Sequence, residues 1–150
     1  MSESAYLLPQ QQMPHNQDAE RSVLGAIMQD STAMMAAAET LTAEDFFTPA
    51  HQTIYAAALE LNRVAMAVDL VTMDAELSKT GNLTGVGGVE YLAYLASTIP
   101  TTANVRQYID IVQDKALLRR LIRASGEIMD MGYSPGAASK NIAEDRKSVV

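Results

Sequence analysis

The feature that most constrains the fold is residues 104–131, the longest helical pattern in the chain. This stretch has no proline, Gly126 is its only glycine, and Asn104 stands before it as a natural N-cap. At 1.5 Å per residue the helix would be roughly 40 Å long, more than the diameter of a small domain. The sequence therefore predicts a helix too long to be covered by one small core.

The apolar side of this helix changes face near Ala116 and Leu117. Before that point one face carries Val105, Tyr108, Ile109, Val112 and Ala116. After it the apolar stripe carries Leu117, Leu121, Ala124, Ile128 and Met131, flanked by Leu118 and Ser125. A helix whose stripe changes sides is expected to pack on two bodies. We expect the first half to dock on the preceding domain, and the second half on another helix, another subunit, or both.

Five shorter helices are predicted before the long one, and the predicted fold is all-α. Alanine and methionine carry much of the apolar content and aromatic residues make up only 5% of the chain, which favours helix over sheet. The predicted helices begin after the N-caps Asn16, Asp30 or Ser31, Thr48 and Thr72, and at Val89. Thr42 and Asp45 form a capping box, Pro49 opens the third helix, and Gly81 and Pro100 end the fourth and fifth.

The predicted organisation has four parts. Residues 1–15 form a flexible tail, residues 16–103 a compact helical globule, and residues 104–133 a long arm helix. Residues 132–136 have the composition of a turn, and residues 134–150, with few apolar side chains, are a turn and the start of an incomplete second arm or a linker.

The sequence offers little catalytic chemistry. It has no phosphate-binding G-x-x-x-x-G-K-[ST] motif, and the glycines between Gly85 and Gly88 are expected to form a helix connector. His15 and His51 are far apart, and His51, in the first turn of its helix, is expected to be a packing or capping residue. Glu44 and Asp45 are adjacent in sequence, so their carboxylates point in different directions on a helix and are poor candidates for an acid/base pair. We therefore predict no catalytic, cofactor or metal site, and an α-helical enzyme with an unrecognised site is the weakest alternative.

Arg119, Arg120 and Arg123 form the one basic cluster. It is either a solvated helix face or a contact for an acidic partner. DNA phosphate is disfavoured, because the chain carries a formal net charge of −7 and nonspecific nucleic-acid binding needs a positive surface. The chain has no cysteine, no secretory signal pattern and no long apolar run, so we expect a soluble, cytoplasmic protein.

A series of short motifs, in this order, resembles the N-terminal domain of bacterial replicative DNA helicases, the DnaB family. The motifs are Pro14-His15-Asn16, Ala19-Glu20-x-Ser22-Val23-Leu24-Gly25-Ala26, Glu44-Asp45-Phe46-Phe47, His51, Ile54-Tyr55, Val68-Asp69-Leu70-Val71-Thr72, Gly87-Gly88-x-x-Tyr91-Leu92, Thr102-Ala103-Asn104-Val105, Tyr108 and Lys115-Ala116-Leu117-Leu118-Arg119. Each motif is weak alone, and the match covers about residues 14–133. Their order is what makes the resemblance specific.

The resemblance implies a role in a hexameric helicase at the replication fork. In that family a small helical globule is followed by a helical hairpin, hairpins pair between subunits, and the resulting collar receives primase and helps organise helicase loading. ATP and Mg²⁺ belong to a separate RecA-like motor domain, so this chain alone is expected to have no helicase activity and to bind little DNA. The candidate subunit interface is Leu117, Leu118, Leu121, Ile128 and Met131.

Two interpretations follow from the resemblance. The first is a collar domain that self-associates through the arm, as a dimer or within a hexamer, and docks primase and a helicase loader. The second is a stand-alone helical regulator that binds the helicase or its loader. The sequence downstream of Val150 would distinguish them, because a continuation into a P-loop domain excludes the second.

Overall fold

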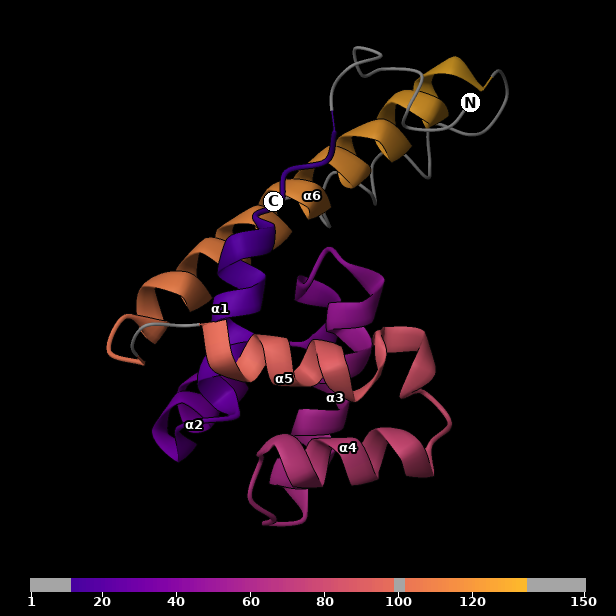
Figure 1. Cartoon of the computed structure of the whole chain (residues 1–150). Helices are drawn as coiled ribbons and strands as arrows, with labels where there is room; N and C mark the ends of the chain where they lie inside the picture. Colours follow the sequence, from indigo (N-terminus) through magenta and orange to yellow (C-terminus); the bar gives the residue numbers. More distant parts are fainter. Residues whose placement is uncertain (1–11, 99–101, 135–150) are drawn as a thin grey trace. The chain divides into compact units, whose positions relative to one another are not determined.

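The computed structural model describes residues 12–98 and 102–134, and all the regular structure in these ranges is helical (Figure 1). The α-helices are α1 (Gln17–Ile27), α2 (Ser31–Thr40), α3 (Pro49–Arg63), α4 (Leu70–Lys79), α5 (Gly88–Thr98) and α6 (Val105–Tyr133). Two short 3₁₀ helices, η2 (Ala43–Asp45) and η3 (Thr84–Val86), lie in the connections. The predicted all-α fold is confirmed.

The chain divides into two compact units. One unit runs from residue 15 to residue 116, and the other contains, among the described residues, 12–14 and 117–134. The division therefore falls inside α6, between Ala116 and Leu117, at the point where the apolar stripe changes face. The first unit is larger than the predicted globule of residues 16–103, because it includes the first part of the long helix.

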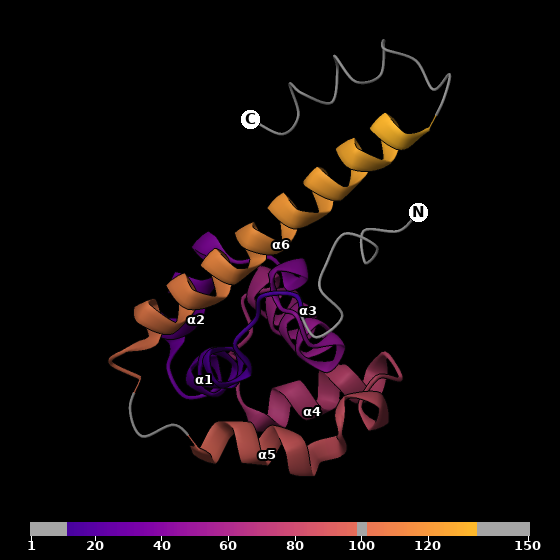
Figure 2. The same cartoon turned by 90° about the horizontal axis from the view of Figure 1, so that it is seen from above.

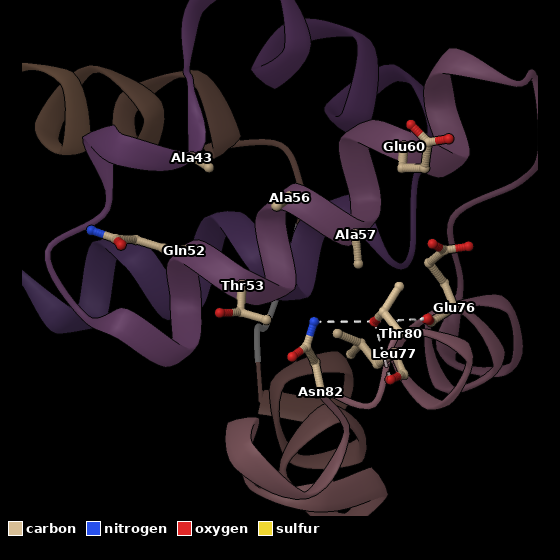
Figure 3. A pocket seen from close by; sticks show the side chains of 10 residues that line it. All are labelled: Ala43, Gln52, Thr53, Ala56, Ala57, Glu60, Glu76, Leu77, Thr80 and Asn82. Atoms are coloured by element: carbon tan, nitrogen blue, oxygen red, sulfur yellow. Dashed lines mark hydrogen bonds between the residues drawn. The ribbon is translucent and has the colours of Figure 1, made fainter.

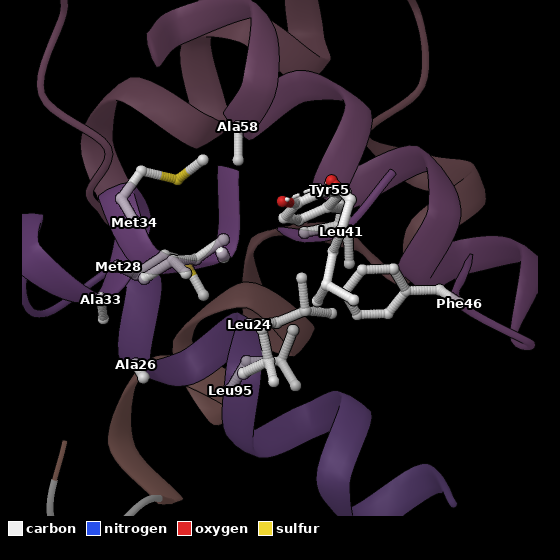
Figure 4. Close-up of a cluster of buried hydrophobic side chains, with 14 of the residues drawn as sticks. Leu24, Ala26, Met28, Ala33, Met34, Leu41, Phe46, Tyr55, Ala58 and Leu95 are labelled. Carbon is white, nitrogen blue, oxygen red and sulfur yellow. Dashed lines mark hydrogen bonds between the residues drawn. The ribbon is translucent and has the colours of Figure 1, made fainter. Parts of the chain in front are cut away.

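Helix α1 lies at the centre of the first unit. It contacts α2, α3 and α5, while α4 contacts α3 and α5. Figure 2 looks nearly along the axis of α1 and shows these helices around it. Figure 4 shows part of the core that they enclose, with Leu24 of α1 close to Leu95 of α5, and the Phe46 ring beside Tyr55 at a centroid distance of 4.8 Å.

The first part of α6 belongs to this core. Val105, Ile109, Val112 and Ala116 are each less than 9% exposed, and the first three belong to the same hydrophobic cluster as the residues of α1. Burying four such side chains supplies a few kcal/mol of hydrophobic stabilisation, at about 25 cal/mol per Å² of apolar surface. The predicted docking of the first half of the long helix on the globule is confirmed.

Most helix starts agree with the capping residues predicted from the sequence. Asn16 accepts a hydrogen bond from the Ala19 amide at 2.9 Å, and Asp30 caps α2 in the same way. The capping box of Thr42 and Asp45 is present. These signals act over three or four residues, so neighbouring chain segments do not override them.

Helix α4 starts elsewhere than predicted, and α6 runs into a segment with the composition of a turn. Asp69, rather than Thr72, is the N-cap of α4. Thr72 is the third residue of the helix, and the two form a capping box: each side chain accepts a hydrogen bond from the other residue's backbone amide. Helix α6 ends at Tyr133, the last residue of the predicted arm helix, and so includes Gly132 and Tyr133 of the segment with the composition of a turn. A single glycine lowers helix propensity by only about 1 kcal/mol and does not by itself end a long helix.

Helices α3 and α4 end in the same backbone motif with different residues. In each, a left-handed residue follows the C-cap, and the next amide bonds back to the third-last helical carbonyl: Met66 to Leu61 at 2.9 Å, and Asn82 to Leu77 at 2.8 Å. In α4 the left-handed residue is Gly81, with φ 75°, as predicted for this helix end. In α3 it is Ala65, with φ 60°.

Ala65→Gly should therefore stabilise the chain. Glycine relieves the left-handed strain of a Cβ-bearing residue, about 1–2 kcal/mol, but adds about 0.4–1 kcal/mol of unfolded-state entropy. We expect a net gain of about 0.5 kcal/mol in the free energy of unfolding, measured by urea denaturation. The reverse substitution at the equivalent position of α4, Gly81→Ala, should lower the free energy of unfolding. An increase would contradict this explanation.

Some predictions concern residues outside the described ranges. The flexible tail falls there for residues 1–11, and the second arm or linker for residues 135–150. Among the helices of the described residues, none is long and apolar enough to cross a membrane.

Candidate functional site

A polar network lies inside the first unit, centred on Glu20 of α1. Glu20 is 2% exposed and His51 of α3 is 1% exposed, so both are fully enclosed. Buried ionisable groups are uncommon unless they are paired and hydrogen-bonded. The contacts of Glu20 therefore show what the network does.

The Glu20 carboxylate holds the start of α3. It accepts hydrogen bonds from the backbone amides of Phe47, at 2.7 Å, and Thr48, at 3.3 Å. These amides immediately precede the helix, where the helix dipole also favours a negative charge. Thr48 is the N-cap residue, as predicted, but its buried hydroxyl makes no hydrogen bond within the described residues. The Glu20 carboxylate instead binds the two amides before the helix and so holds the chain where it enters α3.

His51 joins Glu20 to α5. Its Nδ1 is 2.7 Å from the Glu20 carboxylate, and its Nε2 is 2.6 Å from the Tyr91 hydroxyl. A carboxylate can only accept, so Nδ1–H donates to Glu20; in a neutral ring, Nε2 then accepts from the Tyr91 hydroxyl. The chain Tyr91–His51–Glu20 thus connects α5, α3 and α1.

Glu20 is ionised in the folded chain. Burial by itself would raise the pKa of Glu20, but the hydrogen bonds from His51 and from the amides of Phe47 and Thr48 outweigh it and hold that pKa below its ordinary value of 4.5. Burial raises the pKa of Tyr91, so its hydroxyl keeps its proton near neutral pH. The network is thus an ionised carboxylate that accepts hydrogen bonds from His51 and from two backbone amides.

Stability should fall in mild acid because of Glu20. Its pKa is lower in the folded than in the unfolded chain, so its stabilisation is fully present above about pH 4.5 and is lost as the pH falls through the folded pKa. Thermal unfolding at pH 7, 5, 4 and 3 should show a steeper loss for the natural chain than for Glu20→Gln. Parallel curves for the two chains would contradict this assignment.

The network joins three helices and lies away from the best-formed cavities. Three cavities among the described residues have linings that include none of Glu20, His51 and Tyr91. The cavity shown in Figure 3, of about 470 Å³, lies against α3 and α4, and its carboxylates Glu60 and Glu76 are within ion-pair distance of Arg63 and Lys79. Within the described residues, no group of three or more His, Asp or Glu side chains is placed to hold a metal ion.

The candidate interface residues lie in the second unit, on the second part of α6. Leu117, Leu118 and Leu121 are 58%, 43% and 52% exposed. Ile128 and Met131 are half-buried, whereas Met129, which was not in the predicted set, is 40% exposed. Large apolar side chains at this exposure on one helix are typical of a surface that contacts another protein.

The basic cluster does not form one solvated face. Arg120 and Arg123 are exposed, but Arg119 is 2% exposed and its Nη1 donates a 2.8 Å hydrogen bond to the Pro14 carbonyl. The expectation of an exposed Arg119 needs correction, since its side chain is buried and hydrogen-bonded to a residue 105 positions away. Arg120 and Arg123 keep the exposure that a partner contact requires.

Sequence reasoning missed the polar network although its residues were all in the family motifs. Glu20 entered the sequence analysis only as part of a family motif, and His51 was expected to be a packing or capping residue. The available signal was their position on the helix. Glu20 lies three residues before the buried Val23, and His51 lies three and four residues before the buried Ile54 and Tyr55, so each shares a face with core residues. A polar residue on the core face of a helix indicates a buried partner.

A family model and individual relatives place the sequence in the same protein family. The sequence matches the family described as DnaB-like helicase N terminal domain over residues 12–114. It is 46% identical over 121 residues to the replicative DNA helicase DnaB of Geobacillus stearothermophilus, covering 81% of this chain and 27% of the relative. It is 43% identical over 133 residues to the DnaB of Mycobacterium leprae, covering 89% and 22%. The chain thus spans about a quarter of the length of these relatives.

Solved structures with the same fold include two that are informative. The crystal structure of the N-terminal domain of DnaB helicase from Mycobacterium tuberculosis has a TM-score of 0.87 and 39% identity, covering 92% of this chain and 98% of that one. A DnaB-like replicative helicase, described with its interactions with primase, has a TM-score of 0.75 and 25% identity, covering 90% and 32%.

Proposed function

The chain belongs to the family of DnaB-like helicase N-terminal domains, and from that premise we propose that it is an assembly and primase-docking module acting in the cytoplasm during DNA replication. The 150 residues correspond to the N-terminal domain of these helicases, do not include their motor domain, and are not catalytic by themselves. The proposal therefore concerns binding to proteins.

The observation that carries the proposal is the apolar face of the second part of α6. Leu117, Leu118 and Leu121 leave about half of their surface exposed, and Ile128 and Met131 continue the same stripe. Fully burying an exposed leucine contributes about 1.5–3 kcal/mol, and about half of that remains available at each of these positions, so covering the stripe favours association. We propose that a second copy of the chain covers it, as a dimer or as part of a hexamer.

A second contact is proposed for the exposed arginines. Arg120 and Arg123 lie on the same helix as the apolar stripe and can pair with carboxylates of primase or of a helicase loader. DNA is a weaker candidate, because the chain's net charge of −7 opposes phosphate binding. For this domain we propose neither an ATP site nor a metal site, in line with the absence of a phosphate-binding motif from its sequence.

Titration with the helicase-binding domain of the cognate primase tests the docking role. Calorimetry should show saturable binding, and the charge reversal Arg120→Glu/Arg123→Glu should weaken it about tenfold, which corresponds to about 1.4 kcal/mol. Binding should also weaken as salt is raised.

The matched control is Arg106→Glu, a charge reversal at an exposed position of α6 that lies in the other unit. It should leave primase binding unchanged. Absence of binding by a folded, self-associated sample would refute the docking role, and equal loss in the control would refute the assignment to Arg120 and Arg123.

A further inference from the structure

A groove lined by methionine side chains lies in the first unit, where the end of α1, the start of α2 and the segment after α3 meet. Its volume is about 480 Å³, within the usual range of ligand-binding pockets. Four of the chain's nine methionines line it: Met28, Met34, Met35 and Met66. We call it the methionine groove.

The methionines divide into buried and exposed pairs. Met28 and Met34 are 6% and 3% exposed, and Figure 4 shows them next to each other at one end of the core. Met35 and Met66 are 59% and 52% exposed. The buried pair can form the base of the groove, while the flexible thioether side chains of the exposed pair are accessible to a binding partner. Methionine is unbranched and polarisable, so such a surface adapts to different apolar side chains.

Backbone geometry fixes one wall of the groove. The left-handed Ala65 and the hydrogen bond from the Met66 amide to the Leu61 carbonyl reverse the chain directly after α3. This reversal places Ala65, Met66, Ala67 and Val68 in the lining. In isolation a non-glycine residue in this conformation is unfavourable, by about 1–2 kcal/mol.

The charges in the lining are all of one sign. Asp30 and Asp69 are its only charged residues, and none of the described residues that line it is lysine, arginine or histidine. Both aspartates cap helices, Asp30 at the start of α2 and Asp69 at the start of α4. Each helix N-terminus offsets about half an elementary charge. The groove therefore keeps a net negative charge beside its apolar base.

We propose that the methionine groove binds a basic amphipathic helix of a partner protein. A large apolar side chain of that helix enters between the methionines, and a lysine or arginine three or four residues away meets Asp30 or Asp69. A second copy of this chain is a poorer occupant, because each copy carries a net charge of −7. The groove lies entirely within residues 27–69, so the inference does not depend on the proposed arm contact.

Methyl NMR of the methionines tests the proposal with a defined probe. The probe is a synthetic helix of about five turns (~18 residues) built from leucine and lysine, with a matched peptide in which glutamate replaces lysine. The basic peptide should shift the Met35 and Met66 methyl signals saturably, at micromolar concentrations, and should leave the buried core residue Met73 unchanged. The acidic peptide should bind at least tenfold more weakly.

Two sets of variants separate the apolar and charged contributions. Met35→Gln/Met66→Gln should weaken binding about tenfold. Asp30→Asn/Asp69→Asn should weaken it several-fold and reduce its salt dependence, while keeping both caps, because asparagine caps a helix as well as aspartate does. Val71→Gln alters an apolar side chain that is 76% exposed and lies outside the groove lining, and it should change nothing.

Three results would overturn the proposal: equal binding of both peptides, shifts confined to Met129 and Met131 of α6, or binding that survives the groove variants. Concentration-dependent shifts of Met35 and Met66 without peptide would also overturn it, by assigning the groove to a second copy. Loss of primase docking or of self-association through α6 leaves these signals unaffected, so the two proposals fail separately.

Discussion

Replacing Glu20 with alanine is expected to lower the free energy of unfolding by about 3 kcal/mol or more, because each buried donor left without an acceptor costs about 1–3 kcal/mol. The change leaves the amides of Phe47 and Thr48 and the Nδ1–H of His51 without their acceptor in a buried place. For a chain of this size the midpoint of thermal unfolding should fall by about 10 °C. Circular dichroism on heating measures it.

Controls on the same helix and in the same network make this prediction specific. Asp18→Ala removes a first-turn carboxylate whose side chain is 89% exposed, and should lower stability by less than about 1 kcal/mol. Tyr91→Phe removes one hydrogen bond of His51 and should lower it by about 1 kcal/mol. Glu20→Ala combined with His51→Ala should lower stability by less than the sum of the two single changes. An additive result would show that the two residues act separately.

Leu121→Glu is expected to weaken self-association at least tenfold and to leave the helical circular dichroism signal mostly unchanged. Leu121 is 52% exposed in the single chain, so the new charge remains hydrated in the monomer. In an interface the same charge would be buried without a partner, which costs several kcal/mol. Sedimentation velocity at a series of concentrations gives the dissociation constant.

The matched control is Val71→Glu, which places the same charge at a 76% exposed apolar position in the other unit. It should leave self-association as it is, and the first turn of α4 tolerates a carboxylate. If Leu121→Glu unfolds the globule instead, then α6 does not pack on two bodies and the interpretation of its stripe change is wrong.

The sequence predicted what depends on near neighbours. Asn16, the capping box of Thr42 and Asp45, and Gly81 were each recognised within four residues of the helix end they serve. The change of face in α6 was also visible, because helical periodicity is a property of one continuous segment. The position of that change agrees with the division between the two units at Ala116 and Leu117.

What the sequence did not predict depends on contacts between distant residues. Glu20, His51 and Tyr91 are separated by 31 and 40 positions, and nothing local to Glu20 shows that it binds the amides before α3. Arg119 is buried and bonded to Pro14, 105 positions away. The motifs that carried the family resemblance contained Glu20, His51, Tyr91 and Arg119 but gave them no role. Their shared position on otherwise apolar helix faces was the usable signal.

The central claim is that the second part of α6 joins copies of this chain, and its mass in solution tests that claim most directly. Sedimentation equilibrium of the natural chain should show a concentration-dependent increase from 16.2 kDa towards at least twice that mass, with Leu121→Glu remaining near the lower value. A natural chain that stays at 16.2 kDa at the highest concentration reached, while fully folded, would contradict the claim.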